Sequence, residues 1–145
     1  MNNQNSLLFL LSVLLLSSCS MAEMPEADDA FLPLSIDQVE TYRVEDLLLR
    51  LIKHNMEIEP RFELELIKPG GRKGVDRREV TSITLDGKTL SFTESAGVYV
   101  ESMGANNEGA TLVLEYFHLQ GSAVMIECTF PVVNQKIEPP QCQSE

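Results

Sequence analysis

Basic side chains are scarce in this sequence. Its 145 residues include 11 lysines and arginines against 22 aspartates and glutamates, which gives a formal net charge of −11 at neutral pH. Nucleic acids and anionic lipid headgroups are therefore disfavoured as partners, because phosphate binding needs a net basic surface. A basic protein partner fits this charge, since complementary fields select partners and speed their association. Acidity can also serve only to keep a protein soluble, and the composition leaves both interpretations open.

Motifs for catalysis or metal binding are also scarce. The chain has no G-x-S-x-G, P-loop or H-E-x-x-H motif, no C-x-x-C pair and no calcium loop of alternating acids. His54 and His118 lie at no ligand spacing from a cysteine, and both are expected to be structural. Glu115 and Glu127 fall on neighbouring predicted strands, but no further pattern accompanies these two carboxylates. We therefore expect no enzymatic activity, no cofactor and no metal ion.

Long apolar runs are lacking too, apart from one short run near the N-terminus. Leu7–Leu16 consists of nine apolar residues and one serine. It is too short to span a bilayer as a helix, which needs roughly 20 apolar residues. It has the length of the hydrophobic region of a secretory signal peptide, and the small residues Ser17 and Ser18 follow it.

The run Leu16-Ser17-Ser18-Cys19 resembles the lipobox of bacterial lipoproteins. The resemblance implies that the leader, residues 1–18, is removed and that Cys19 becomes the lipidated first residue. Two or more acyl chains anchor a protein firmly to a membrane. Ser20, in place of an aspartate after the cysteine, implies sorting to the outer membrane, facing the periplasm. The segment Met1–Ser6 departs from the usual signal pattern, because it has no lysine or arginine.

Two cysteines remain once Cys19 is lipidated. Cys128 and Cys142 are an even pair in an oxidising compartment, which predicts a disulfide. Their separation of 14 positions (142 − 128) corresponds to a contribution of about 3 kcal/mol in the chain-entropy model. Pro139 and Pro140, between them, cannot continue a strand ladder, so we expect a tail that is folded over a sheet and pinned by the disulfide.

The mature chain divides into a tether and one domain. Residues 19–33 are polar, acidic and bounded by proline, a composition typical of a linker between a membrane and a domain. Residues 34–145 are enough for a single globular domain with a modest core. Within the domain, Lys68–Arg78 carries five basic residues and one acidic residue among glycines, which predicts a mobile, solvated loop.

A helix is expected over residues 37–54. Ser35 and Gln38 fit a capping box at its start. Apolar residues follow at the spacing of one helical face: Val44, Leu47, Leu48, Leu51 and Ile52. Asp46 and Arg50 would form an i,i+4 ion pair on another side. A strand remains the alternative, since the middle of this segment is a short, nearly continuous apolar run.

After this segment the apolar period changes to two, as in strands. The predicted strands are Phe62–Leu66, Val80–Leu85, Thr89–Phe92, Val98–Val100, Thr111–Leu119 and Ser122–Phe130. Asp86-Gly87 and Gln120-Gly121 predict tight hairpin turns. The expected fold class is mainly β (α+β): an antiparallel β-sandwich of six or more strands with one N-terminal helix, or a curved sheet wrapped on that helix.

The composition of the segment SMGANNEG, residues 102–109, predicts a loop that binds a partner. Loops at the ends of a sandwich often carry binding residues. The candidate contacts are Ser102, Met103, Asn106, Asn107 and Glu108, with the methionine as an adaptable apolar contact. A plain hairpin connection is the alternative.

The overall layout is similar to that of lipoprotein immunity proteins encoded beside type VI secretion effectors that attack peptidoglycan. The similar features are the lipobox, one acidic β-rich domain and the pair Cys128 and Cys142. The resemblance implies an inhibitor that plugs the cleft of a basic, wall-degrading secreted enzyme. One alternative is an accessory lipoprotein of a secretion or envelope complex, similar to a pilotin, with an apolar groove for a partner segment along the predicted helix at Val44–Ile52. Another is a structural or ligand-binding lipoprotein of the envelope.

Overall fold

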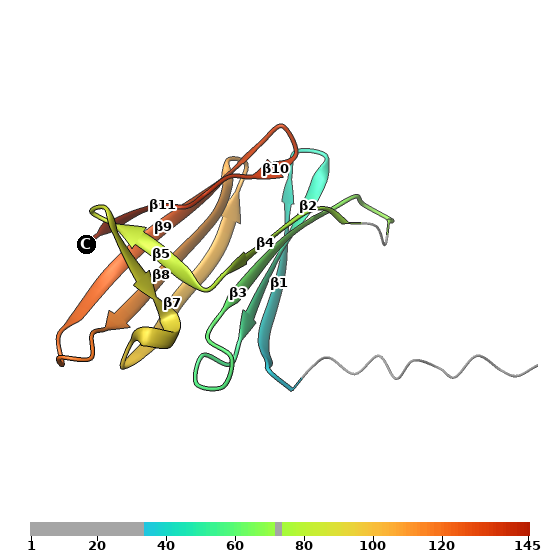
Figure 1. Ribbon diagram of the computed structural model, residues 1–145. Coiled ribbons are helices and arrows are strands. Elements are labelled where there is room, and N and C mark those ends of the chain that lie inside the picture. Colours follow the sequence, from blue (N-terminus) through green and yellow to red (C-terminus); the bar gives the residue numbers. More distant parts are fainter. Residues whose placement is uncertain (1–33, 72–73) are drawn as a thin grey trace, which may run out of the picture. The chain divides into compact units, whose positions relative to one another are not determined.

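The computed structural model describes residues 34–71 and 74–145 (Figure 1). These residues form antiparallel β-sheets with one short 3-10 helix, so the mainly β class predicted from the sequence is confirmed. The predicted signal peptide (1–18), the lipidated Cys19 and the tether (19–33) lie outside the described residues, as do positions 72–73 of the basic segment. In the two described ranges, no helix is long and apolar enough to cross a membrane.

The first sheet has four antiparallel strands in the order β1-β2-β3-β4. They are β1 (Ile36–Val44), β2 (Leu47–His54), β3 (Phe62–Ile67) and β4 (Gly74–Val80). Leu49 pairs with Leu66 and Leu51 with Leu64, and all four are buried. Side chains alternate between the faces of a strand, so these leucines share the core face. The intervening residues of β2 and β3 form the opposite, outer face.

The helix predicted over residues 37–54 is wrong, because β1 and β2 form a hairpin there. The turn is Glu45–Asp46, with Glu45 in the left-handed region at φ 52°. Leu47 and Leu51 lie on the core face of β2, whereas Leu48 and Ile52 lie on the outer face. Both faces of the strand therefore carry buried or half-buried apolar side chains. When both faces of a strand are apolar, some of its apolar residues fall three or four positions apart by coincidence. This is the spacing from which one face of a helix is predicted.

Both hairpin turns predicted from glycine are present. Asp86 and Gly87, with φ 50° and 77°, connect β5 (Ser82–Leu85) to β6 (Lys88–Ser91). Positive φ at both central positions is the geometry for which this dipeptide is favoured. The turn at Gly121 joins β8 (Gly109–Phe117) to β9 (Ala123–Val133).

The second sheet contains the remaining long strands. Its order is β10-β9-β8-β7, and β11 pairs with the same edge of β9 as β10 does. The strands not yet located are β7 (Gly97–Asn106), β10 (Lys136–Ile137) and β11 (Gln141–Ser144), and the 3-10 helix η1 (Phe92–Glu94) precedes β7.

The loop predicted at the end of β7 is largely strand. Ser102 and Met103 belong to β7 and pair with β8, so placing them in a loop is wrong. Only Asn107 and Glu108 form the turn, and the side-chain oxygen of Asn106 accepts a hydrogen bond from the backbone N–H of Glu108 at 2.8 Å. The small and polar residues of β7 carry a weak strand signal of their own, and pairing with the strongly alternating β8 decides their conformation.

A single core lies between the two sheets. Its fully buried side chains come from both of them and include Leu49, Leu66, Leu114, Ile126 and Phe130. Side chains of β4, at the edge of the first sheet, hydrogen-bond to β10, at the edge of the second sheet. Arg78 on β4 donates two hydrogen bonds to the backbone oxygen of Ile137 on β10, at 3.0 and 2.9 Å. Asp76 accepts one from the N–H of Ile137 at 2.8 Å.

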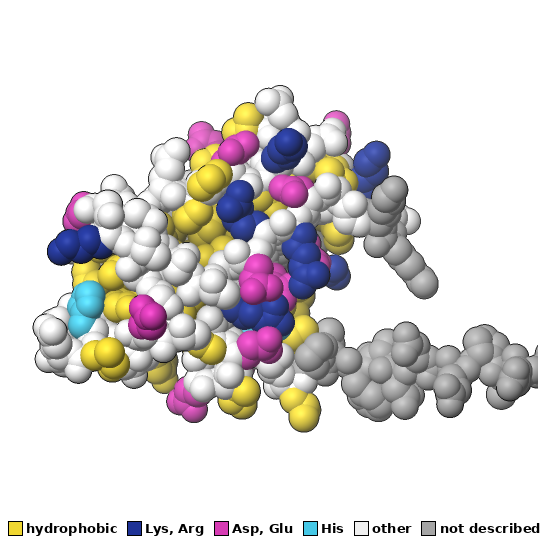
Figure 2. Space-filling model, viewed as in Figure 1, with side chains coloured by type: hydrophobic (Ala, Val, Ile, Leu, Met, Phe, Trp, Pro, Cys, Tyr) yellow, Lys and Arg dark blue, Asp and Glu magenta, His cyan; other side chains and the backbone are white. Residues whose placement is uncertain are grey.

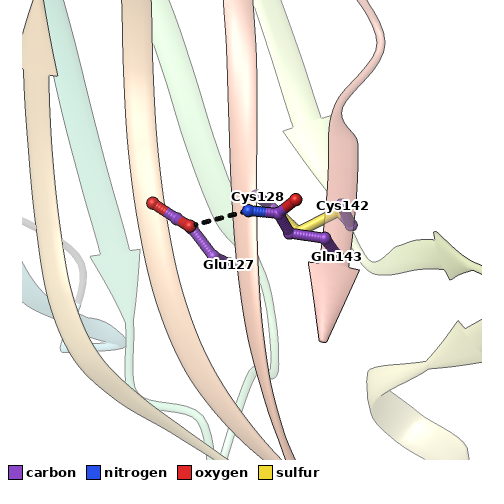
Figure 3. Close-up of a disulfide and its surroundings, with 4 residues drawn as sticks. All are labelled: Glu127, Cys128, Cys142 and Gln143. Carbon is purple, nitrogen blue, oxygen red and sulfur yellow. Dashed lines mark hydrogen bonds between the residues drawn. A yellow bond between two sulfur atoms is a disulfide. The ribbon is translucent and has the colours of Figure 1, made fainter. Parts of the chain in front are cut away.

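The C-terminal strand is joined covalently to the second sheet (Figure 3). Cys128 on β9 and Cys142 on β11 form a disulfide, the pairing that the sequence predicts. The two residues face each other in the strand register, and Gln143 donates a hydrogen bond from its side chain to Glu127 at 3.1 Å. The tail therefore extends the sheet at its edge, where the sequence predicted that it would fold over the sheet.

Candidate protein-binding hollows and the charged cluster beneath them

Two open hollows lie next to each other between the β2–β3 connection and the start of β7. The larger has a volume of about 660 Å³, and Pro60, Thr93 and Phe117 contribute to its wall. The smaller has a volume of about 290 Å³, and Asp37, Lys53 and Asn55 contribute to its wall. The residues that line both hollows, and so separate them, are Met56, Glu57, Val98 and Tyr99. We refer to the pair as the Tyr99 hollows.

Large hydrophobic side chains are exposed at the same end of the domain as these hollows. Ile58 in the β2–β3 connection is 73% exposed, Tyr99 is 70% exposed, and Leu119 in the β8–β9 turn is 75% exposed. The three segments that carry them lie along one end of the domain, at the bottom of Figure 1. Along the same edge, Figure 2 shows hydrophobic side chains next to carboxylates. Exposed apolar groups with a polar rim are typical of protein-binding surfaces.

The charge of the hollow walls is negative. The Nζ atom of Lys53 lies 2.6 Å from a carboxylate oxygen of Asp37, so these two charges compensate each other. Among the charged side chains that line the hollows, the exposed carboxylate of Glu57 is then left without a compensating charge.

Hydrogen bonds fix the conformation of the β2–β3 connection. The backbone oxygen of Asn55 accepts from the N–H groups of Ile58 and Glu59, at 3.1 and 2.8 Å. Its side-chain oxygen accepts from the N–H of Glu57 at 3.0 Å, and its own N–H donates to the backbone oxygen of Ser35 at 2.6 Å. The wall formed by Met56 and Glu57 is therefore a defined turn.

A charged cluster lies directly beneath this connection, on the outer face of the first sheet. His54 is 2% exposed and Glu63 is 4% exposed. The Nε2 atom of His54 lies 3.0 Å from a carboxylate oxygen of Glu63, and its Nδ1 atom lies 3.2 Å from the hydroxyl of Ser35. Glu59 approaches the same Nδ1 atom at 3.3 Å. Both ring nitrogens of the histidine thus face oxygen atoms.

Two arginines complete the charged cluster. Arg61 lies 2.8 Å from Glu59, 2.6 Å from Glu63 and 2.9 Å from Glu79. Arg77 donates a hydrogen bond to the second carboxylate oxygen of Glu63. Burial on its own raises the pKa of Glu63, but the hydrogen bond from Arg77 and the charges of both arginines outweigh burial and hold this pKa below its usual value.

The burial of the charged cluster indicates a structural role. A substrate cannot approach His54 or Glu63, because almost none of their surface is exposed. In the described parts of the chain, no group of three or more histidine, cysteine and acidic side chains is placed to hold a metal ion. The cluster holds the start and end of the β2–β3 connection together, and so supports one wall of the Tyr99 hollows.

The contacts predicted from sequence lie away from these hollows. Tyr99 is near the start of β7 and Asn107 follows its end, eight positions on, which is about 26 Å along a strand that rises about 3.3 Å per residue. Asn106 and Glu108 are exposed at that far end, and Ser102 is exposed within the strand. Met103 is half-buried against the core, where it lines an apolar gap of about 20 Å³ between the sheets. The structure places Asn106, Asn107 and Glu108 together at the turn, whereas Ser102 and Met103 lie farther along β7.

Sequence reasoning missed both the Tyr99 hollows and the charged cluster. The sequence predicts that Tyr99 lies in a short strand, Val98–Val100, with no partner role, and no local pattern indicates the hollows. His54, which is expected to be structural, is buried between strands and hydrogen-bonded at both ring nitrogens. His118 is half-buried, and its ring lies 5.0 Å from the ring of Tyr116 in an edge-to-face arrangement.

Comparisons of the chain with known protein families, with curated proteins and with solved structures give no match.

Proposed function

We propose that this chain is a lipoprotein of the outer membrane, anchored through Cys19 and facing the periplasm, that binds and blocks a basic peptidoglycan-degrading enzyme. The observation that carries the proposal is the exposed apolar and acidic end of the domain, with Ile58, Tyr99 and Leu119 70–75% exposed. Large apolar side chains beside carboxylates are suited to a partner that is itself positively charged.

Blocking an enzyme needs a stable surface and no catalytic group of its own. In this proposal the two sheets act as a β-sandwich that presents connections at each end. The disulfide and the clamp of Asp76 and Arg78 on Ile137 hold the second sheet in place. A surface that is already ordered loses little conformational entropy on binding, which favours tight inhibition.

The accessory-lipoprotein alternative predicts an apolar groove for a partner segment. The helix at Val44–Ile52 that the sequence suggests for this groove is absent, because that segment consists of the end of β1, a turn and most of β2. No other observation favours the accessory role specifically, so the accessory role is treated as one possible result of the inhibition test below.

Inhibition is tested with the full chain purified from membranes in mild detergent. Purified peptidoglycan hydrolases of high isoelectric point, lysozyme included, are assayed on labelled peptidoglycan with and without the chain. We expect nanomolar inhibition of at least one enzyme, weakened at about 1 M salt, where charges are screened beyond about 3 Å. No inhibition across the panel, with co-purification of a secretion-complex subunit, contradicts the proposal and supports the accessory role.

The anchor is tested separately by metabolic labelling with palmitate. We expect the wild-type chain to be labelled and to fractionate with the outer membrane, and the variant Cys19→Ser to lose both properties. A wild-type chain that takes up no label contradicts the lipoprotein assignment without bearing on inhibition.

A further inference from the structure

We propose that the Tyr99 hollows are the docking site of a basic protein, which inserts one apolar side chain flanked by lysine or arginine. The proposal rests on the proposed function only in taking the partner to be an enzyme. The chemistry of the occupant follows from the hollows themselves.

The larger hollow has room for an apolar side chain together with the residues that flank it. Its volume of about 660 Å³ falls in the range of sites that bind small molecules. Met56, Pro60 and Phe117 contribute apolar atoms to the wall, and Tyr99 stands at its border with the smaller hollow. Tyrosine offers a large contact area with few rotatable bonds and is enriched among the residues that dominate binding energy.

The smaller hollow sets the preferred charge of the occupant. Asp37 and Lys53 compensate each other, and the exposed Glu57 carries the remaining charge at the border of both hollows. A lysine or arginine beside the inserted apolar side chain complements this carboxylate and lies within reach of the Tyr99 ring. An acidic neighbour would be repelled by the same carboxylate.

The walls are formed before any partner arrives. Asn55 fixes the turn that carries Met56 and Glu57, and the charged cluster below ties both ends of the β2–β3 connection to the sheet. A preformed site avoids the ordering cost that weakens binding by mobile loops. The occupant is therefore expected to bind without rearrangement of the domain.

Methionine-methyl NMR on the full chain in detergent tests this docking site. The probes are the peptides acetyl-Lys-Leu-Lys-amide and acetyl-Glu-Leu-Glu-amide at millimolar concentration. We expect the lysine peptide to shift the methyl signal of Met56, and the glutamate peptide to leave it in place. Met125, on β9 and outside the lining of the hollows, is the internal control and should not move with either peptide.

Matched variants assign the binding to individual side chains. Tyr99→Ser should weaken binding of the lysine peptide at least about tenfold, whereas Val133→Ser, also at an exposed apolar residue, should change it less than about twofold. Glu57→Lys should abolish the preference for the lysine peptide, and Glu108→Lys, in the turn at the far end, should keep it. All four positions are exposed, and the Met103 signal reports whether each variant is folded.

Three results would overturn the docking site: no shift of Met56, equal shifts with both peptides, or a shift that depends on the concentration of the chain alone. The last would mean that a second copy of the chain covers the hollows. Binding of the lysine peptide without inhibition of any hydrolase keeps the docking site and removes the enzyme partner. Inhibition that Tyr99→Ser leaves intact keeps the proposed function and removes this docking site.

Discussion

His54 and Glu63 lie on the outer face of a sheet and are nevertheless among the least exposed residues of the domain. Each has an oppositely charged or hydrogen-bonding neighbour: Glu63 contacts His54, Arg61 and Arg77, and His54 also contacts Ser35. A buried charge is tolerated when such partners surround it, and removing one partner leaves the others uncompensated. Stability at this site therefore depends on the ionised state of Glu63.

Glu63→Gln should lower the free energy of unfolding at pH 7 by about 2 kcal/mol, because the neutral amide leaves both arginines without their buried partner.

The pKa of Glu63 is held below its ordinary value in the folded state. The ionised carboxylate of Glu63 therefore stabilises the fold fully above the pKa of the unfolded chain, near 4.5. This stabilisation is lost as the pH falls through the lower pKa that Glu63 has in the folded state. Urea unfolding from pH 7 to pH 3 should show a shallower loss of stability for Glu63→Gln than for the wild type. Glu108→Gln, in an exposed turn, is the control, and an equal loss for wild type and Glu63→Gln would contradict this role.

Gly109 should not tolerate a side chain. Its φ is 148°, and a Cβ atom placed there would lie 2.1 Å from the backbone oxygen of Phe130. Gly109→Ala should therefore lower the free energy of unfolding by about 2 kcal/mol or more, since backbone atoms must move. Gly97→Ala, with ordinary φ and no atom within 4 Å of the new Cβ, should be nearly neutral in the same thermal unfolding measurement. Equal effects of the two substitutions would show that the close approach at Gly109 is unimportant.

At the scale of elements, alternation of polar and apolar residues predicts most of the core strands. It fails for β2, where both faces of the strand are covered, and the loop predicted over Lys68–Arg78 is wrong for residues 74–78, which belong to β4 and pair with β3. The outer face of β2 carries Leu48, Ile52 and His54 between core leucines, so its pattern imitates a helix. The charged cluster that buries His54 is built from β3, β4 and a connection, which are distant in sequence, and no local pattern reveals it. The sequence predicts the start of β7 as the short strand Val98–Val100, but the second half of β7 depends on pairing with β8.

The disulfide is the element-scale feature with the clearest energetic consequence. The Cys128–Cys142 bridge holds β11 on the edge of β9 and closes a loop of 14 positions. Cys142→Ser should lower the free energy of unfolding by about 3 kcal/mol, with the buried Cys128 left in place to avoid a cavity. Denaturant unfolding of wild type with reductant should give a similar loss, and the variant should no longer respond to reductant. A wild-type chain unaffected by complete reduction would contradict this contribution.

At the scale of the whole molecule, the sequence predicts the mainly β class, two hairpin turns and the cysteine pair, because each of these has a local signal. The Tyr99 hollows have none, since they combine Met56 and Glu57 from one connection with the start of β7 and the end of β8. The lipobox, the tether and the outer-membrane location remain predictions from residues 1–33. The basic partner remains a proposal that rests on the acidic charge of the sequence.

The most direct test of this account is to measure inhibition of a basic peptidoglycan hydrolase by three chains side by side: wild type, Tyr99→Ser and Val133→Ser. The account predicts nanomolar inhibition by wild type and by Val133→Ser, and an inhibition constant at least about tenfold higher for Tyr99→Ser. Equal inhibition by all three chains, or none by the wild type, would contradict the central claim that this end of the domain blocks a wall-degrading enzyme.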